Sequence, residues 1–159
     1  MKISIICVGK VKESFYREAI AEYSKRLSRY AKLEIIEVAD EQTPEGASES
    51  LQEQIKDKEG MRILSKLKED AYVVTLEIGG KKMDSLAFSA FLEKAQVISR
   101  GQLFFIIGGS LGLSKMVLDR SNEAISFSEM TFPHQLMRVI LLEQIYRGYR
   151  IANKEPYHK

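Results

Sequence analysis

One stretch of this sequence limits the fold more than any other: the apolar residues and glycines from Gln102 to Ser114. Leu103 to Ile107 are five consecutive apolar residues, which is typical of a strand buried on both faces of a parallel sheet. Gly108, Gly109 and Gly112 follow, and glycine lets a backbone turn sharply and approach a ligand closely. Open α/β folds bind ligands at the carboxyl ends of their strands. The stretch therefore predicts either a binding loop or a plain strand-to-helix turn.

Segments with strand-like and helix-like patterns alternate along the rest of the chain. The other predicted strands are Ile3 to Val8, Leu33 to Val38, Ala71 to Ile78 and Ala124 to Phe127. The predicted helices run from a cap at Ser14 to about Leu27, from Ser48 to Glu69 with a break near Gly60, from Asp84 or Ser85 to about Ser99, from Leu113 to Ser121, and from Pro133 to about Ala152. This alternation predicts an α/β fold, a mostly parallel sheet with helices on both faces, in a single domain over residues 1–159.

Composition narrows the class of protein. The length of 159 residues is enough for one domain with a real core. No apolar run approaches the roughly 20 residues that span a bilayer, and the N-terminus carries no signal-peptide pattern. Cys7 is the only cysteine, so no disulfide can form within the chain, which favours a reducing cytoplasm. We therefore expect a cytoplasmic protein without a membrane segment.

Several common kinds of site are disfavoured. Two histidines and one cysteine cannot form a His/Cys metal cage with normal spacing, so no metal is expected. The first strand is followed by a single glycine rather than by Gly-x-Gly-x-x-Gly, and no P-loop follows the later glycines. The Gly-x-Ser-x-Gly elbow of serine hydrolases is also missing.

Three segments that follow strands in the second half remain as candidates: Leu76 to Gly80, Gly108 to Gly112, and Phe127 to Phe132. If their strands are neighbours in a parallel sheet, the three loops meet at one edge. Backbone amides and carbonyls of such loops can bind an adenine edge and a ribose. The pattern is consistent with a nucleoside pocket, and equally with loops that merely anchor the core.

Longer motifs in the second half carry a family resemblance. Phe-Ile-Ile-Gly-Gly-Ser-Leu-Gly begins at Phe105, Ile-Ser-Phe-Ser-Glu-Met-Thr-Phe-Pro-His-Gln-Leu-Met-Arg begins at Ile125, and Glu-Gln-Ile-Tyr-Arg-Gly-Tyr-Arg-Ile begins at Glu143. With the closing Pro-Tyr-His-Lys, they resemble the SPOUT methyltransferases, and within these the family of ribosomal RNA large-subunit methyltransferase H. The resemblance extends from Met1 to Lys159.

The resemblance implies a SPOUT-type fold whose C-terminal part forms a trefoil knot, which periodicity cannot predict. It also implies a homodimer that binds S-adenosylmethionine (SAM). The residues that it assigns to the cofactor are Leu76, Gly108, Phe127, Ser128, Glu129, Met130, Thr131 and Phe132.

The resemblance further implies methylation of N3 of a pseudouridine in helix 69 of 23S rRNA, in the assembled 70S ribosome. His158 is the expected base or substrate-orienting group, because the N3 proton must leave and imidazole titrates near neutral pH. Tyr157 is expected to stack on the target base or to hydrogen-bond to it. Without the resemblance, His158 would be interpreted as a disordered surface residue and Tyr157 as a hydrophobic anchor of the tail.

Positive charges near this tail are candidates for RNA contacts. Arg147, Arg150 and Lys154 follow one another at spacings of three and four residues and so share one helix face. Arg138 and Lys159 complete the predicted set, although an ordinary solvated face explains any one of them equally well. The alternatives are a related SPOUT enzyme that methylates a tRNA ribose 2′-hydroxyl, and a non-catalytic RNA-binding module of the ribosome.

Overall fold

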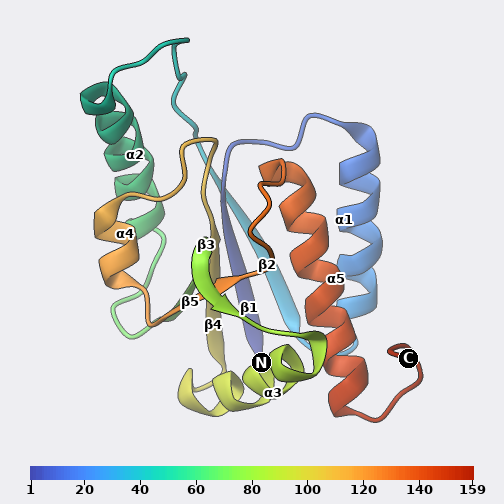
Figure 1. Cartoon of the computed structure of the whole chain (residues 1–159). Helices are drawn as coiled ribbons and strands as arrows, with labels where there is room; N and C mark the ends of the chain where they lie inside the picture. The colour runs from blue at the N-terminus through green and yellow to red at the C-terminus, as the bar shows by residue number, and fades with distance from the viewer.

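The computed structural model describes residues 1–159, in which strands and helices alternate from end to end (Figure 1). The strands are β1 (Lys2–Val8), β2 (Lys32–Val38), β3 (Tyr72–Lys82), β4 (Gln102–Ile107) and β5 (Glu123–Ser126). The helices are α1 (Ser14–Leu27), α2 (Glu49–Leu64), α3 (Ser85–Ile98), α4 (Lys115–Arg120) and α5 (His134–Ala152).

The strands form one sheet in the order β2-β1-β4-β3-β5, and every neighbouring pair is parallel. The predicted α/β class with a parallel sheet is therefore confirmed. Strands β4, β3 and β5 are neighbours, so the segments that follow them leave the same edge of the sheet.

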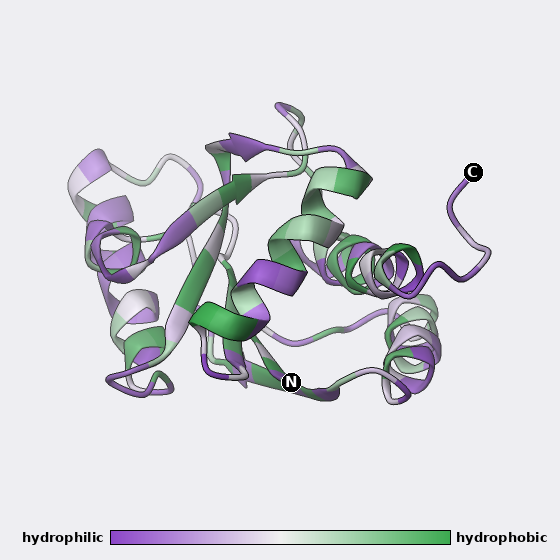
Figure 2. Cartoon of the chain, turned by 90° about the horizontal axis from the view of Figure 1, so that it is seen from below, coloured by the Kyte–Doolittle hydropathy of each residue, from purple (hydrophilic) through white to green (hydrophobic).

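Alternate residues of the central strands face two different helical layers. Ile5 and Phe105 belong to a core cluster shared with α1, α3 and α5, whereas Ile6 and Ile106 belong to a second cluster shared with α2 and α4. All four side chains are at most 1% exposed, which explains the unbroken apolar run that ends at Ile107. Figure 1 shows the sheet between these two layers, and Figure 2 shows hydrophobic residues on its strands and a hydrophilic C-terminal tail.

The glycine pair Gly79-Gly80 does not end the third strand, and the predicted loop from Leu76 to Gly80 is wrong. Strand β3 continues to Lys82, with a shift of register against β5. A Cβ at Gly80 would lie 2.6 Å from the backbone carbon of Ile125, so only glycine lets the two strands approach this closely.

Helix α2 is continuous through Gly60, so the predicted break is also wrong. A Cβ at this position would lie 2.2 Å from Oγ of Ser114, and the glycine instead allows α2 to pack closely against the segment that leads into α4. Ser14 does not cap α1 as expected, because the capping position is Glu13 and no side chain caps it.

Strand order and register do not describe how one segment threads through another. The trefoil knot that the resemblance implies therefore stays a prediction.

Candidate active site

A cavity of about 460 Å³ opens beside the end of β5, on the side of the sheet that α3 and α5 cover. Side chains from β5, the following loop, α3, α5 and the C-terminal tail line it. The apolar lining residues are Met83, Phe88, Ile125, Phe127, Phe132 and Ile140. The polar ones are Asp84, Ser85, Ser126, Gln144 and His158. An apolar cavity with a few convergent polar groups is typical of a site for a small organic ligand.

The loop after β5 is held by hydrogen bonds of its own. Oγ of Ser126 donates to the carbonyl of Ser128 at 3.1 Å, and the amide of Met130 donates to Oγ of Ser128 at 3.0 Å. Of the predicted cofactor residues, Phe127 and Phe132 line the cavity. The polar side chains Glu129 and Thr131 are exposed, as is Met130, and Glu129 pairs with Lys82 at 2.6 Å.

The other two predicted cofactor residues lie differently. Leu76 pairs with Ile125 in the β3–β5 ladder and so adjoins the cavity without lining it. Gly108 also lies outside the lining residues. A Cβ on it would lie 3.0 Å from the side chain of Leu113, so packing of the loop alone is a sufficient reason for glycine there.

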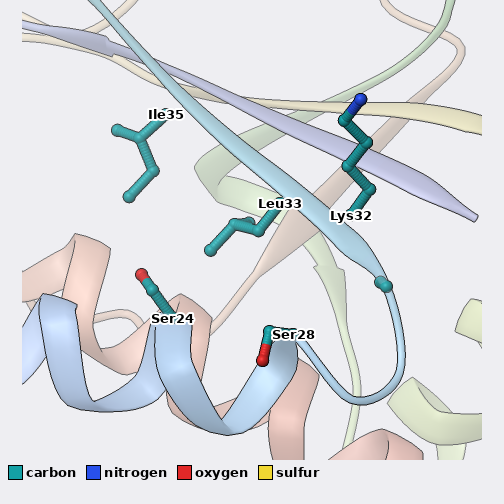
Figure 3. A pocket seen from close by; sticks show the side chains of 6 residues that line it. Ser24, Ser28, Lys32, Leu33 and Ile35 are labelled. Atoms are coloured by element: carbon teal, nitrogen blue, oxygen red, sulfur yellow. The ribbon is translucent and has the colours of Figure 1, made fainter.

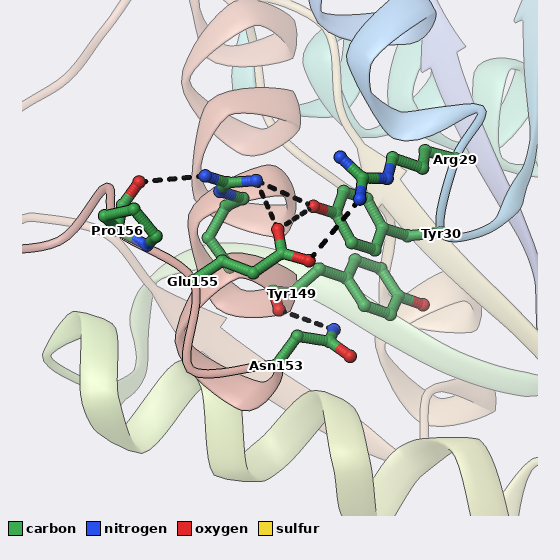
Figure 4. Close-up of polar contacts among 7 residues, drawn as sticks. Arg29, Tyr30, Tyr149, Asn153, Glu155 and Pro156 are labelled. Atoms are coloured by element: carbon green, nitrogen blue, oxygen red, sulfur yellow. Dashed lines mark hydrogen bonds and ion pairs between the residues drawn. The ribbon is translucent and has the colours of Figure 1, made fainter.

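The C-terminal tail folds back along α5 and is clamped by Arg150. Figure 4 shows Glu155 and Pro156 of the tail in this network, with Tyr30 beside them. This guanidinium binds the carboxylate of Glu155 and donates to the carbonyl of Pro156 at 2.9 Å and to the hydroxyl of Tyr30 at 3.2 Å. The clamp joins the turn after α1, through Tyr30, to residues far along the chain. It turns the last residues toward the cavity, which His158 reaches.

Tyr157 is packed rather than free. Its hydroxyl donates to Oε1 of Glu143 at 3.0 Å, and its ring lies edge-on against Tyr146 with 4.9 Å between ring centres. Burial, followed by the hydrogen bond to Glu143, raises the pKa of the Tyr157 phenol to about 12. Tyr157 is therefore a neutral anchor of the tail in this conformation.

The predicted RNA-binding arginines are already occupied. Arg138 is 1% exposed and binds Glu37 at 2.6 Å and the carbonyl of Gly9 at 2.7 Å, so it offers no guanidinium to RNA. Arg147 pairs with Glu143 at 2.7 Å. Arg150 is engaged in the clamp with Glu155, Pro156 and Tyr30. Lys154 and Lys159 are exposed and form no salt bridge.

Sequence reasoning missed Glu143 and Gln144 as parts of this site. The spacing of four residues between Glu143 and Arg147 on one helix could have indicated the ion pair. No sequence signal joins Gln144 to Ser85 of α3, whose Oγ donates to it at 2.9 Å.

A second cavity, of about 590 Å³, lies between α1 and the edge strand β2 (Figure 3). Leu33 and Ile35 extend from β2 on the side of Ser24 and Ser28, whereas Lys32 points away. This cavity is larger, but it contains none of the predicted site residues and no cluster of titratable groups, so we do not regard it as the active site.

No group of three or more His, Cys, Asp or Glu side chains is arranged to hold a metal ion. None of the five helices is both long enough and apolar enough to span a bilayer.

A parallel α/β sheet with a ligand-sized cavity at the end of its last strand is typical of a domain that binds a small organic molecule. Residues 1–158 match the family described as "Predicted SPOUT methyltransferase", and the chain belongs to this family. It is a methyltransferase of the SPOUT class.

Curated relatives match over the whole chain. A protein of Clostridium botulinum (strain Eklund 17B / Type B) is 58% identical over 159 residues, and one of Clostridium beijerinckii is 55% identical, with 100% of both chains covered in each case. Both are named "Ribosomal RNA large subunit methyltransferase H". Among solved structures, a probable methylase family protein from Haemophilus influenzae Rd KW20 is 10% identical with a TM-score of 0.49, covering 96% of this chain and 66% of that one.

Proposed function

We propose that this protein transfers a methyl group from SAM to N3 of a pseudouridine in helix 69 of 23S rRNA, in the assembled 70S ribosome of the cytoplasm. The observation that carries the proposal is the identity of 55% and more, over the full length, to proteins named as large-subunit rRNA methyltransferases. The choice of N3 of pseudouridine rests on the family resemblance in the motifs around Gly108, Phe132 and His158.

The cavity beside β5 is the proposed cofactor site. Its volume of about 460 Å³ lies within the usual range for small-molecule sites, and Phe127 and Phe132 offer apolar faces to an adenine ring. We include the rest of the loop, Ser128 to Thr131, together with Leu76 and Gly108, because backbone amides and carbonyls of neighbouring turns can bind the ribose and the base edge. When bound, SAM supplies an activated methyl group on its sulfonium, so no metal is needed.

The residues of the chain have the task of positioning the target base. His158 reaches the cavity from the tail, and Tyr157 holds the tail against α5. We propose His158 and Tyr157 as the residues nearest to the target base. The tail would also exclude water from the transfer.

Contacts to RNA phosphates are proposed for Lys154 and Lys159, which are exposed and unpaired, and, as the sequence predicts, for Arg147 and Arg150. Arg138 is left out of this proposal because it is buried.

We further propose a homodimer, formed through α1 and α5. Tyr23 and Tyr146 lie together on these helices with Arg26 over both rings, at 5.4 and 5.7 Å from their centres. Tyrosine and arginine are among the residues enriched at protein interfaces. Sedimentation at micromolar concentration tests the dimer, and a monomer would contradict it.

Mass spectrometry of rRNA nucleosides from a strain without this protein tests the activity. Loss of N3-methylated pseudouridine supports the proposal, whereas unchanged rRNA with loss of a methylated tRNA ribose would favour the tRNA alternative. Calorimetry with SAM separates an enzyme from a non-catalytic module, because the module should show no saturable binding.

A further inference from the structure

Glu143 of α5 is the centre of a hydrogen-bond network that links the cavity wall to the tail. Its Oε1 accepts from Tyr157 at 3.0 Å and from Nη2 and Nε of Arg147 at 2.7 and 3.1 Å. Its Oε2 accepts from Nε2 of Gln144 at 2.7 Å, and Gln144 in turn accepts from Ser85 of α3. The network therefore runs from α3, across α5, to the last residues of the chain.

This network differs from the ordinary ion pairs between helix neighbours. The side chains of Glu143 and Arg147 are 18% and 24% exposed, whereas those of Asp119 and Lys115, at the same spacing on α4, are 63% and 83% exposed. The pair on α4 has no further side-chain partner. A half-buried pair with four donors on one carboxylate holds its side chains in one arrangement, which an exposed pair does not.

Arg147 carries this arrangement to His158. With Nε and Nη2 fixed on Glu143, its guanidinium lies over the ring of Tyr157, 4.6 Å from the ring centre. The remaining Nη1 lies 3.4 Å from Nδ1 of His158, at the long end of hydrogen-bond distances. A guanidinium can only donate, so Nδ1 must be the acceptor. In a neutral imidazole the proton is then on Nε2.

We propose that Glu143 is a positioning residue that, through Arg147, holds His158 in the Nε2–H tautomer, so that His158 presents a hydrogen-bond donor to the cavity. The inference rests on the proposed function, in which the target base enters here. The chemical group that such a donor recognises is a carbonyl oxygen, and a uracil-type base carries one on each side of N3. Since Nδ1 is engaged by Arg147 and Nε2 already carries a proton, His158 orients the base and does not accept the N3 proton.

The tautomer can be read directly, without activity. The chain has only two histidines, so two-bond ¹H–¹⁵N correlation spectra of the ¹⁵N-histidine-labelled protein show two rings, and a His134→Gln variant assigns them. At about pH 8, where an ordinary imidazole is neutral, His158 should show a protonated Nε2 and an unprotonated Nδ1. Arg147→Met and Glu143→Gln should each give a mixture of tautomers, whereas Asp119→Asn should not. An Nδ1–H tautomer in the wild type, or no change in both variants, would overturn the inference.

Methyl transfer to ribosomes provides the second readout. Glu143→Gln should lower kcat by about 10- to 100-fold, as misplacement of an orienting group does, with the Kd for SAM unchanged and Asp119→Asn as the control. A wild-type protein that transfers no methyl group would refute the proposed function, while the tautomer result would still stand. An active wild type with an equally active Glu143→Gln variant would refute only the role of Glu143.

Discussion

The guanidinium of Arg138 lies 2.6 Å from the carboxylate of Glu37, joining α5 to the end of β2 across 101 residues of sequence. Only 1% of the arginine side chain is exposed, against 38% for the glutamate. The buried guanidinium of Arg138 therefore has one anionic partner, Glu37. The carbonyl of Gly9 accepts from the same guanidinium, while Nε of Arg138 is buried without a partner. The pair fastens the start of α5 to the carboxyl edge of the sheet.

We expect Glu37→Gln to lower the free energy of unfolding by about 3 kcal/mol, because it leaves a buried guanidinium without its counter-charge. Urea denaturation measures the change. Asp119→Asn is the matched control, because Asp119 pairs with Lys115 on an exposed surface of α4, away from the proposed dimer interface, and should cost less than about 1 kcal/mol. Equal losses in the two variants would contradict the structural role of the Arg138–Glu37 pair.

Adjacent glycines in β3 should differ sharply in tolerance. A Cβ at Gly80 would lie 2.6 Å from the backbone of Ile125, which lines the cavity, whereas a Cβ at Gly79 has no neighbour within 4 Å. Gly80→Ala should therefore cost about 1–3 kcal/mol of stability, as overpacking does, and weaken SAM binding in calorimetry. Gly79→Ala should leave both near wild-type values, and the reverse pattern would exclude this register of β3 and β5.

The pH dependence of stability should contain a contribution from His134. Burial, followed by the charge of Arg138, lowers the pKa of this imidazole below its ordinary value of 6.5. The unfolded chain thus binds more protons than the folded chain between the two pKa values. The free energy of unfolding therefore rises as pH increases through that window, and it falls as pH decreases through it. Asp40 opposes this shift and Lys12 adds to it.

Unfolding curves of the wild type and His134→Gln, measured from about pH 7 to about pH 5, test this contribution. The wild type should lose more stability toward low pH than the variant does. Parallel losses in the two proteins would show that His134 titrates alike in both states.

The tail clamp should govern how firmly the last residues are held. Glu155→Gln removes the charge that binds Arg150 and, at 3.9 Å, Arg29 (Figure 4). We expect faster hydrogen exchange in the C-terminal peptide and slower methyl transfer, measured by mass spectrometry on the same samples. Glu49→Gln, at the exposed start of α2, is the control. A tail that exchanges as slowly as in the wild type would argue against the clamp.

Local patterns predicted the sheet well, because its central strands are buried on both faces and so consist mainly of apolar residues. The run from Leu103 to Ile107 and the first strand were placed within one residue of their observed starts and ends. Glycine was the main source of error. Gly60 and Gly80 looked like breaks in a helix and a strand. Each position instead requires glycine because another backbone or side chain packs closely against it, and that neighbour is far away in the sequence.

The same limit applies to the site. Helical spacing placed Arg147 and Arg150 on one face and could have indicated the pair of Arg147 with Glu143, but it could not reveal that Glu155 of the tail neutralises Arg150. Arg138 of α5 looked like a surface cation because its partner Glu37 is on β2, 101 residues away in the sequence. That His158 approaches the cavity followed only from the family resemblance, since the fold of a tail depends on tertiary contacts such as the clamp of Arg150.

The most direct test of the account is to incubate the purified protein with SAM that carries a trideuterated methyl group and with 70S ribosomes that lack the modification. Nucleoside mass spectrometry of the 23S rRNA should then show the label in N3-methylpseudouridine from helix 69. Absence of label from 23S rRNA, or its appearance on a tRNA ribose, would contradict the account.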